Sequence, residues 1–297
     1  PMTRLACPRR VVESEDTVTH FEFGWRSGDG LRIFGQGWKP EGDSRGLICL
    51  VHGLGEHSGR YERLGTDFAE AGYVLAAFDL RGHGRSEGAR GDAPSYEALL
   101  DDVSMLLENA TELFPGVPRF LYGHSLGGSL VLNYALRRSA HLAGVIATSP
   151  WLRTASVLPT WKMVMGRVLY RVVPALAMSN GVESKDLSHD PHLVYHEDPL
   201  VHDRVSARLG IETVAAGEWA IAHAAEFALP LLLVHGDADA ITSCDATREF
   251  AARVPRSCTL KVWPRLYHET HNELNRDEVV AFTLQWVRAH SVQTRES

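Results

Sequence analysis

Short apolar segments alternate with amphipathic segments along most of the chain. The apolar segments are 46–53, 73–80, 119–125, 142–150, 229–239 and 258–264. Strands buried on both faces of a parallel sheet have this continuous apolar character, and helices between them supply right-handed crossovers. The pattern predicts an α/β fold with a mostly parallel central sheet and helices on both faces.

The first two predicted strands follow a different pattern. Residues 19–27 alternate apolar and polar side chains, and a second strand-like segment, 31–40, follows the turn Gly28-Asp29-Gly30. Two such segments around a short glycine turn are typical of a β-hairpin. We expect an N-terminal antiparallel hairpin ahead of the parallel strands.

The alternation of strands and helices breaks over residues 151–205. The first half of this segment is helical in part and rich in Trp, Met and Val, and the second half is polar and rich in turn residues. Open α/β sheets bind ligands beyond the carboxyl ends of their strands, so an insertion at this point predicts a cap over the site. We expect a first core segment, 1–150, a cap, 151–205, and a second core segment, 206–297.

The composition narrows the class of protein. A chain of 297 residues with 44% hydrophobic content can bury a large core. A net charge of -7 and the absence of any Lys- and Arg-rich run argue against nucleic-acid binding. The first 20 residues lack a continuous apolar segment, and no later segment is long and uncharged enough to cross a bilayer. These features favour a soluble, unprocessed protein of the cytoplasm.

The cysteines and the paired histidines do not indicate a metal site. The four cysteines are far apart and show no CxxC spacing, which argues against a disulfide framework or a zinc site and favours a reducing compartment. The sequence His268-Glu-Thr-His271 separates its histidines by three positions, one fewer than the metalloprotease motif requires. We expect no bound metal and no organic cofactor.

Ser125 lies in the sequence Gly123-His124-Ser125-Leu126-Gly127, between a predicted strand and a predicted helix. The G-x-S-x-G pattern in this context is typical of a nucleophile elbow, a turn so tight that glycines are needed beside the serine. Such a turn presents the hydroxyl at a helix N-terminus, where free N–H groups stabilise a developing oxyanion. The alternative is a tight turn that is only structural or that holds a phosphate.

A nucleophilic serine needs a base and an orienting carboxylate, which here should follow in the order Ser, Asp, His. Asp237 and Asp239 follow one predicted strand, and His268 and His271 follow the next. We favour Asp239 because it lies farther into its loop, whereas Asp237 can turn back to cap backbone N–H groups. We favour His268 as the base and expect His271 in a supporting position.

The second oxyanion donor should come from the glycine-rich loop after segment 46–53. We assign the oxyanion hole to the backbone N–H groups of Leu54 and Leu126, the latter directly after the serine. His52 and His57 are expected to brace this loop. The charged residues of 79–86 are expected to brace their own loop by hydrogen bonds.

Six motifs together resemble the α/β-hydrolase superfamily. They are HGLGEHSGRY at 52–61, DLRGHGRSEG at 79–88, GHSLGG at 123–128, YHEDPL at 195–200, HGDADAI at 235–241 and YHETHNE at 267–273. Within that superfamily they are similar to the monoglyceride lipase and lysophospholipase group, also labelled serine aminopeptidase S33-like or hydrolase 4. The resemblance extends from about residue 20 to 290.

The resemblance implies a catalytic triad of Ser125, Asp239 and His268, which agrees with the assignment made from spacing. It implies hydrolysis of a lipid ester that carries one acyl chain, such as a monoacylglycerol, through an acyl-enzyme. It also implies that segment 151–205 is a cap over an apolar acyl tunnel.

The resemblance further implies that Arg60, Tyr195 and His271 hold the glycerol hydroxyls. Related lipases also use an acidic residue near the start of the cap, but residues 151–182 contain no Asp or Glu here. Four basic residues lie there instead: Arg153, Lys162, Arg167 and Arg171. They predict either a solvated helix face or contact with an anionic lipid surface.

Four other functions are weighed against the monoacylglycerol lipase hypothesis. The same triad could act on lysophospholipids or on short and medium-chain esters. A non-catalytic binding protein of the same fold is disfavoured because all three triad positions are filled. A serine at the elbow excludes dehalogenase chemistry, and no feature marks a site for a peptide terminus. Peripheral contact of the cap with membranes or lipid aggregates is a further hypothesis.

Overall fold

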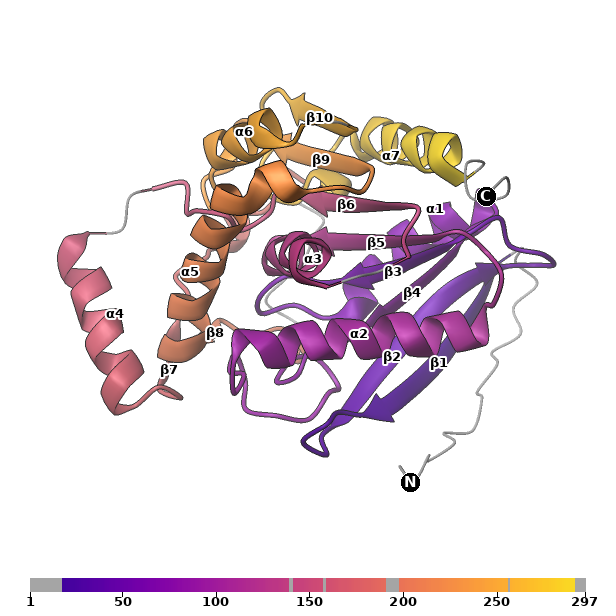
Figure 1. The fold of residues 1–297 in the computed structure, drawn as a ribbon. Coiled ribbons are helices and arrows are strands. Elements are labelled where there is room, and N and C mark those ends of the chain that lie inside the picture. Colours follow the sequence, from indigo (N-terminus) through magenta and orange to yellow (C-terminus); the bar gives the residue numbers. More distant parts are fainter. Residues whose placement is uncertain (1–17, 139–140, 157–158, 191–197, 256, 292–297) are drawn as a thin grey trace.

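A computed structural model describes residues 18–138, 141–156, 159–190, 198–255 and 257–291 (Figure 1). Its main sheet has eight strands in the order β1-β2-β4-β3-β5-β6-β9-β10. The strands are β1 (Val18–Arg26), β2 (Arg32–Pro40), β3 (Leu47–Val51), β4 (Val74–Phe78), β5 (Arg119–His124), β6 (Gly144–Thr148), β9 (Leu231–Gly236) and β10 (Cys258–Trp263). All neighbours from β4 to β10 pair in parallel, which confirms the predicted sheet.

The N-terminal hairpin is also as predicted. Strands β1 and β2 pair antiparallel over their full lengths, with Val18 opposite Pro40 and Arg26 opposite Arg32. Strand β2 then pairs antiparallel with β4 and joins the hairpin to the parallel strands.

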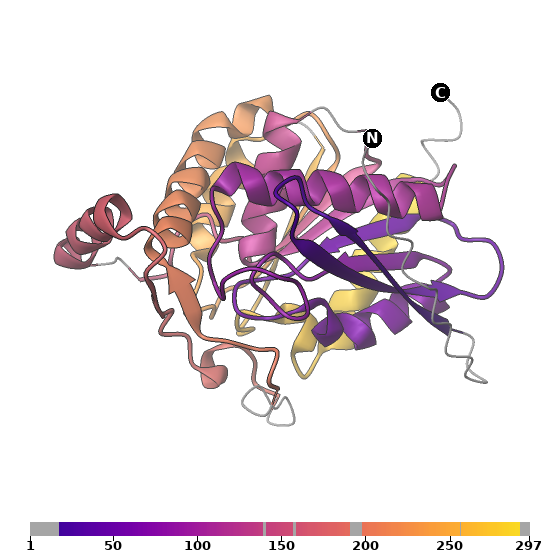
Figure 2. The same ribbon diagram turned by 90° about the horizontal axis from the view of Figure 1, so that it is seen from below.

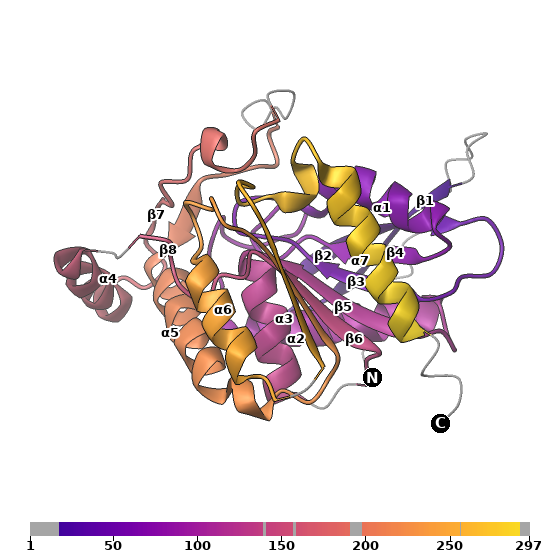
Figure 3. The same ribbon diagram turned by 90° about the horizontal axis from the view of Figure 1, so that it is seen from above.

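The helices cover both faces of the sheet. One face carries α2 (Tyr96–Leu113), α3 (Leu126–Arg137), α5 (Ala207–His223) and α6 (Cys244–Arg253). The other face carries α1 (Glu62–Glu70) and α7 (Arg276–Ser291), as Figures 1 and 3 show. Strand β3 serves both cores, because Leu47, Cys49 and Val51 face the first and Ile48 and Leu50 face the second.

Serine caps fix where three of these helices begin. The hydroxyl oxygens of Ser95, Ser206 and Ser243 each accept a hydrogen bond from a backbone N–H of the first turn of α2, α5 and α6. Such caps satisfy donors that have no partner within the helix and contribute about 1 kcal/mol each.

Residues 151–206 leave the sheet after β6 and rejoin the core at α5. This segment contains α4 (Thr160–Val172), the 3₁₀ helix η2 (Ser184–Asp186) and an antiparallel pair formed by β7 (Ala177–Ser179) and β8 (Arg204–Ser206). Figures 1 and 2 show α4 outside α5, on the side away from the sheet.

The structure bears on the expectations about membrane spans, cysteines and metal sites. No helix in the described ranges combines the length and the apolar character needed to span a bilayer. Cys49, Cys244 and Cys258 are free thiols, and Cys7 lies outside the described residues. Among described residues, no group of three or more His, Cys, Asp or Glu side chains is arranged to hold a metal ion.

Helix α3 begins so close to the end of β3 that a side chain does not fit at Gly127. A Cβ atom at this position would collide with the backbone carbonyl oxygens of Val51 and His52. We therefore predict that Gly127→Ala lowers the free energy of unfolding by about 2 kcal/mol, measured by urea denaturation. Gly28→Ala is the control, since an added Cβ there meets no atom within 4 Å. Equal stability of both variants would contradict the prediction.

Candidate active site

The turn between β5 and α3 holds Ser125 in a strained conformation. Its φ of 54° and ψ of -114° are rarely adopted by a residue with a side chain. A Cβ on Gly123 would collide with the carbonyl of Gly127, so the chain can cross itself here only with glycine. The Ser125 N–H donates to the Thr148 carbonyl at 3.0 Å, and the Ser125 carbonyl accepts from the Trp151 N–H at 2.9 Å. Strain at this position is therefore maintained by its neighbours.

Asp239 and His268 are brought together from the loops after β9 and β10. The distance from His268 Nδ1 to Asp239 Oδ2 is 2.7 Å, and both side chains are buried. Asp239 Oδ1 also accepts from the backbone N–H groups of Ile241 and Thr242 at 2.7 and 3.0 Å. An ionised carboxylate only accepts, so His268 carries its proton on Nδ1 and leaves Nε2 free as a base.

Asp237, the other candidate carboxylate, lies away from His268. It is exposed, and its Oδ1 accepts from the backbone N–H of Arg265 at 2.5 Å. Of the two candidate carboxylates, only Asp239 is bonded to His268.

The charges of this pair support each other. Burial alone would raise the pKa of Asp239, but the charge of His268 and the hydrogen bonds from His235 and His268 hold that pKa well below its usual range. Burial would lower the pKa of His268, yet the Asp239 charge and hydrogen bond outweigh it and raise the pKa. His124, whose ring centroid is 4.8 Å from that of His268, is kept neutral because burial lowers its pKa well below the usual value.

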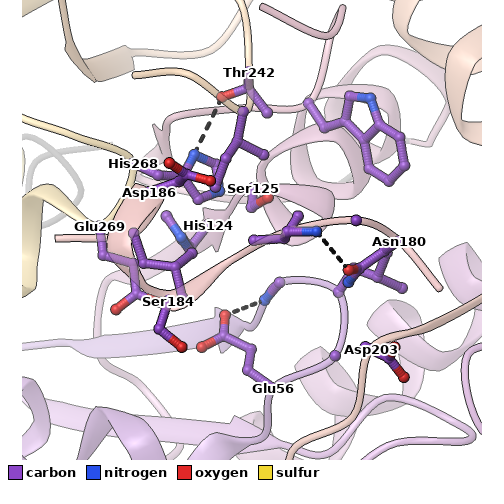
Figure 4. A pocket seen from close by; sticks show the side chains of 18 of the residues that line it. Glu56, His124, Ser125, Asn180, Ser184, Asp186, Asp203, Thr242, His268 and Glu269 are labelled. Carbon is purple, nitrogen blue, oxygen red and sulfur yellow. Dashed lines mark hydrogen bonds between the residues drawn. The ribbon is translucent and has the colours of Figure 1, made fainter. Parts of the chain in front are cut away.

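A cavity of about 450 Å³ opens at this edge of the sheet (Figure 4). Its wall includes Ser125 and His268, the loop after β3 with Leu54 and Glu56, and six residues of the segment 151–206. These six are Asn180, Gly181, Val182, Ser184, Asp186 and Leu187. The apolar part of the wall comes from Leu54, Trp151, Val182, Leu187, Val201, Ala240 and Ile241. The cavity thus combines an apolar surface with a group of ionisable side chains.

The three residues expected to hold glycerol hydroxyls differ in position. Arg60 lines the cavity and donates from one nitrogen to both oxygens of Glu269 at 3.0 Å. His271 is buried, its ring stacked on Tyr61 at 5.2 Å between centroids, and it does not line the cavity. Burial lowers the pKa of His271 to about 4. Tyr195 lies outside the described residues.

None of the five carboxylates on the cavity wall was singled out from the sequence; they are Glu56, Asp186, Asp198, Asp203 and Glu269. Glu56 accepts from the Gly53 N–H at 2.5 Å and from the Tyr61 hydroxyl at 2.7 Å. Glu269 directly follows His268 in the chain, a position that marks it in hindsight. Asp186 reaches the wall from η2, so the cap does place an acid there, but later in the chain than residues 151–182.

The two proposed oxyanion donors come from different elements, a loop and a helix N-terminus. Leu54 follows β3 and lines the cavity, and Leu126 is the first residue of α3. N–H groups in the first turn of a helix have no acceptor within it, which leaves them available to a ligand.

The bracing roles expected for His52, His57 and the loop 79–86 are confirmed. The Gly59 N–H donates to His57 Nδ1 at 3.1 Å. His52 Nε2 accepts from the Leu80 N–H at 2.9 Å. Asp79 accepts from the N–H and hydroxyl of Ser58 at 2.8 and 2.6 Å, and buried Arg81 forms two hydrogen bonds with Asp102.

Of the four basic residues at the start of the cap, Arg153 is part of a structural network. It forms ion pairs with Glu218 of α5 and Glu249 of α6 at 2.6 and 2.5 Å. Arg167 and Arg171 on α4 are exposed. The structure does not describe the side chain of Lys162.

The cap is fastened to the loop that carries His268. The Glu269 N–H donates to the Leu187 carbonyl at 2.8 Å, and the Ser188 hydroxyl donates to the Asn272 carbonyl at 2.9 Å. The His189 N–H donates to buried Glu273 at 3.1 Å. The position of this cap segment and the position of His268 are therefore linked.

Comparison with known proteins gives the family and the fold. The family described as serine aminopeptidase, S33 (Hydrolase_4) matches residues 42–275. A monoacylglycerol lipase of Mycolicibacterium smegmatis is 32% identical over 276 residues, which are 92% of this chain and 98% of that protein. An uncharacterized abhydrolase domain-containing protein of Dictyostelium discoideum is 40% identical over 256 residues, 84% of this chain but 27% of that protein.

The crystal structure of a monoacylglycerol lipase from Paleococcus ferrophilus superimposes with a TM-score of 0.80 at 37% identity. The match covers 87% of this chain and 99% of that one. Together with the parallel sheet and the serine turn, these similarities show that the chain belongs to the serine aminopeptidase, S33 (Hydrolase_4) family and has the α/β-hydrolase fold.

Proposed function

We propose that this protein is a serine ester hydrolase that cleaves lipids with one acyl chain, such as monoacylglycerols. The observation that carries the proposal is the buried Asp239–His268 pair, 2.7 Å apart, whose His268 lines the same cavity as the strained Ser125. The relatives at 32 and 37% identity, which are monoacylglycerol lipases, support the substrate class.

In the proposed reaction Ser125 Oγ attacks the ester carbonyl while His268 Nε2 accepts the hydroxyl proton. Asp239 holds the imidazole in the required tautomer and stabilises its charge. The backbone N–H groups of Leu54 and Leu126 stabilise the oxyanion, each by about 3 kcal/mol. His268 then protonates the leaving alcohol, and water activated by the same histidine releases the fatty acid from Ser125.

The cavity suggests how a monoacylglycerol would be held. One acyl chain would lie on the apolar wall, and the glycerol hydroxyls would lie among the polar side chains. Hydroxyls donate as well as accept, so the carboxylates of Glu56, Glu269 and Asp186 are suitable acceptors. Arg60 and Tyr195 remain proposed contacts to glycerol, while His271 would act through its packing on Tyr61.

The exposed face of α4 supports peripheral contact with lipid surfaces. Trp161, Val164, Val168 and Val172 are 53 to 71% exposed and follow helical spacing, so they share one side. An exposed apolar helix face next to basic residues is typical of interfacial binding. We propose that α4 rests on the surface of membranes or lipid aggregates, from which substrate reaches the cavity.

The substrate proposal predicts a ranking of rates. The values of kcat/KM for 1-oleoylglycerol, 1-oleoyl-lysophosphatidylcholine, triolein and p-nitrophenyl butyrate should be highest for 1-oleoylglycerol. Ser125→Ala should lower hydrolysis of every substrate by on the order of 10⁴-fold or more without loss of folding. A higher rate on triolein would refute the single-chain site, and a folded, active Ser125→Ala protein would refute the mechanism.

The two aspartates offer a matched test of the triad. Asp239→Asn should lower kcat by on the order of 10⁴-fold, because the amide no longer fixes the tautomer of His268. Asp237→Asn should lower kcat by less than about tenfold, since the Asp237 carboxylate accepts from the backbone N–H of Arg265 and an amide oxygen can accept in the same way. The reverse order of effects, measured on 1-oleoylglycerol, would assign the acid to Asp237.

Binding to vesicles tests the role of α4. Val164→Glu combined with Val168→Glu should weaken cosedimentation with mixed phosphatidylcholine and phosphatidylglycerol vesicles by about tenfold or more, because both side chains lose apolar contact. Leu274→Glu changes a residue that is 72% exposed elsewhere in the chain and should bind vesicles as the parent does. Equal binding by all three proteins would remove α4 from the lipid contact.

A further inference from the structure

One oxygen of Asp239 is shared by three donors. Asp239 Oδ2 lies 2.7 Å from His268 Nδ1, 2.8 Å from Thr242 Oγ1 and 3.1 Å from His235 Nε2. All four residues are buried, and His235 and Asp239 side chains are fully shielded from solvent. The carboxylate that orients the proposed base thus carries a second imidazole, which the mechanism above does not use.

The ring of His235 is held in a defined orientation. His235 belongs to β9, and its Nδ1 lies 2.8 Å from the hydroxyl of Thr247 in α6. Since ionised Asp239 can only accept, His235 must carry a proton on Nε2 and point it at the carboxylate. In the neutral ring Nδ1 then accepts from the Thr247 hydroxyl, so both nitrogens are satisfied without a charge.

We infer that His235 is a positioning residue for this reaction, which acts through Asp239 to limit the basicity of His268. The inference rests on the proposed function, since it needs His268 as the base. The N–H of His235 draws electron density from the oxygen that also accepts from His268. A carboxylate that shares its charge between two imidazoles attracts the charged form of His268 less than one that binds His268 alone.

This arrangement sets the acid limb of the pH profile. His268 must be neutral to accept the proton of Ser125, so kcat/KM falls as the pH drops below the pKa of His268. Removing the donor at position 235 leaves more charge on Asp239 Oδ2, which favours protonated His268. The pKa of His268 should rise, and the acid limb should move to higher pH.

Other ionisable groups also face His268, and they are the same in the parent protein and in a variant changed at position 235. The carboxylates of Glu56 and Glu269 favour its charged form, as Asp239 does. The ring centroid of His124 lies 4.8 Å from that of His268, and the ring centroid of His271 lies 4.9 Å from that of His124. Burial disfavours the charged form. A change at position 235 alone therefore reports on the shared oxygen.

Two substitutions of similar polarity distinguish the hydrogen bond that His235 donates to Asp239 from the packing of the His235 side chain. His235→Gln places an amide N–H near the former Nε2 and can still donate to Asp239. His235→Asn is one bond shorter, so it can reach Thr247 but not Asp239. We expect the acid limb of kcat/KM on p-nitrophenyl butyrate to move up by about one pH unit in His235→Asn and to stay near the parent value in His235→Gln.

A third variant keeps the test decisive if His235→Asn does not fold. Thr242→Val is isosteric and removes another donor to the same oxygen, so it should also move the acid limb upward. His83→Gln is the matched control, a buried histidine that does not touch Asp239, and its acid limb should not move.

An unchanged acid limb in folded His235→Asn, or equal shifts in His235→Asn and His235→Gln, would overturn the inference. With His235→Asn unfolded, an unchanged limb in Thr242→Val would do the same. These failures differ from failure of the proposed function, which would appear as full activity in Ser125→Ala. The acid limb is a suitable readout, since a purely structural role of His235 would lower stability or kcat without moving it.

Discussion

The crossing of α3 over the end of β3 is the constraint on which the site depends. The chain must turn at Ser125 with a positive φ, and Gly123 and Gly127 must lack side chains for the crossing to form. Parallel pairing of β5 with β3 and β6 fixes this turn at the carboxyl edge of the sheet. Strands β9 and β10 end at the same edge, so the loops that follow them bring Asp239 and His268 together there. No short sequence motif contains both residues.

The sequence predicted those parts of the protein in which local chemistry and global topology agree. Continuous apolar strands, the hairpin turn and the glycine-flanked serine each have a physical cause within a few residues. The preference for Asp239 over Asp237 also followed from chain geometry. Asp239 lies farther from the end of its strand, so its side chain can meet another loop, whereas Asp237 lies close enough to accept from nearby backbone N–H groups.

Other parts depend on tertiary contacts that a local pattern does not contain. The sequence pattern did not predict α5, because small and apolar residues occur on all sides of this helix. In the structure, Gly217 packs against the Leu152 carbonyl. The position of Asp186 on the cavity wall depends on how the cap folds back over the sheet. Likewise, His235 reads as an ordinary apolar-strand residue until β9, α6 and the Asp239 loop are assembled around it.

The bonds between the cap and the His268 loop divide the cap into two edges of different character. At Leu187, Ser188 and His189 it is tied to the catalytic loop, and breaking each bond costs about 1 kcal/mol. At α4 it projects outward (Figure 2), and no described residue of α4 lines the cavity. Lifting the first edge would disturb His268, the proposed base, whereas movement of the second would leave it in place. Under the proposed function, the side of this segment that meets lipid and the side that holds the catalytic geometry are therefore separate.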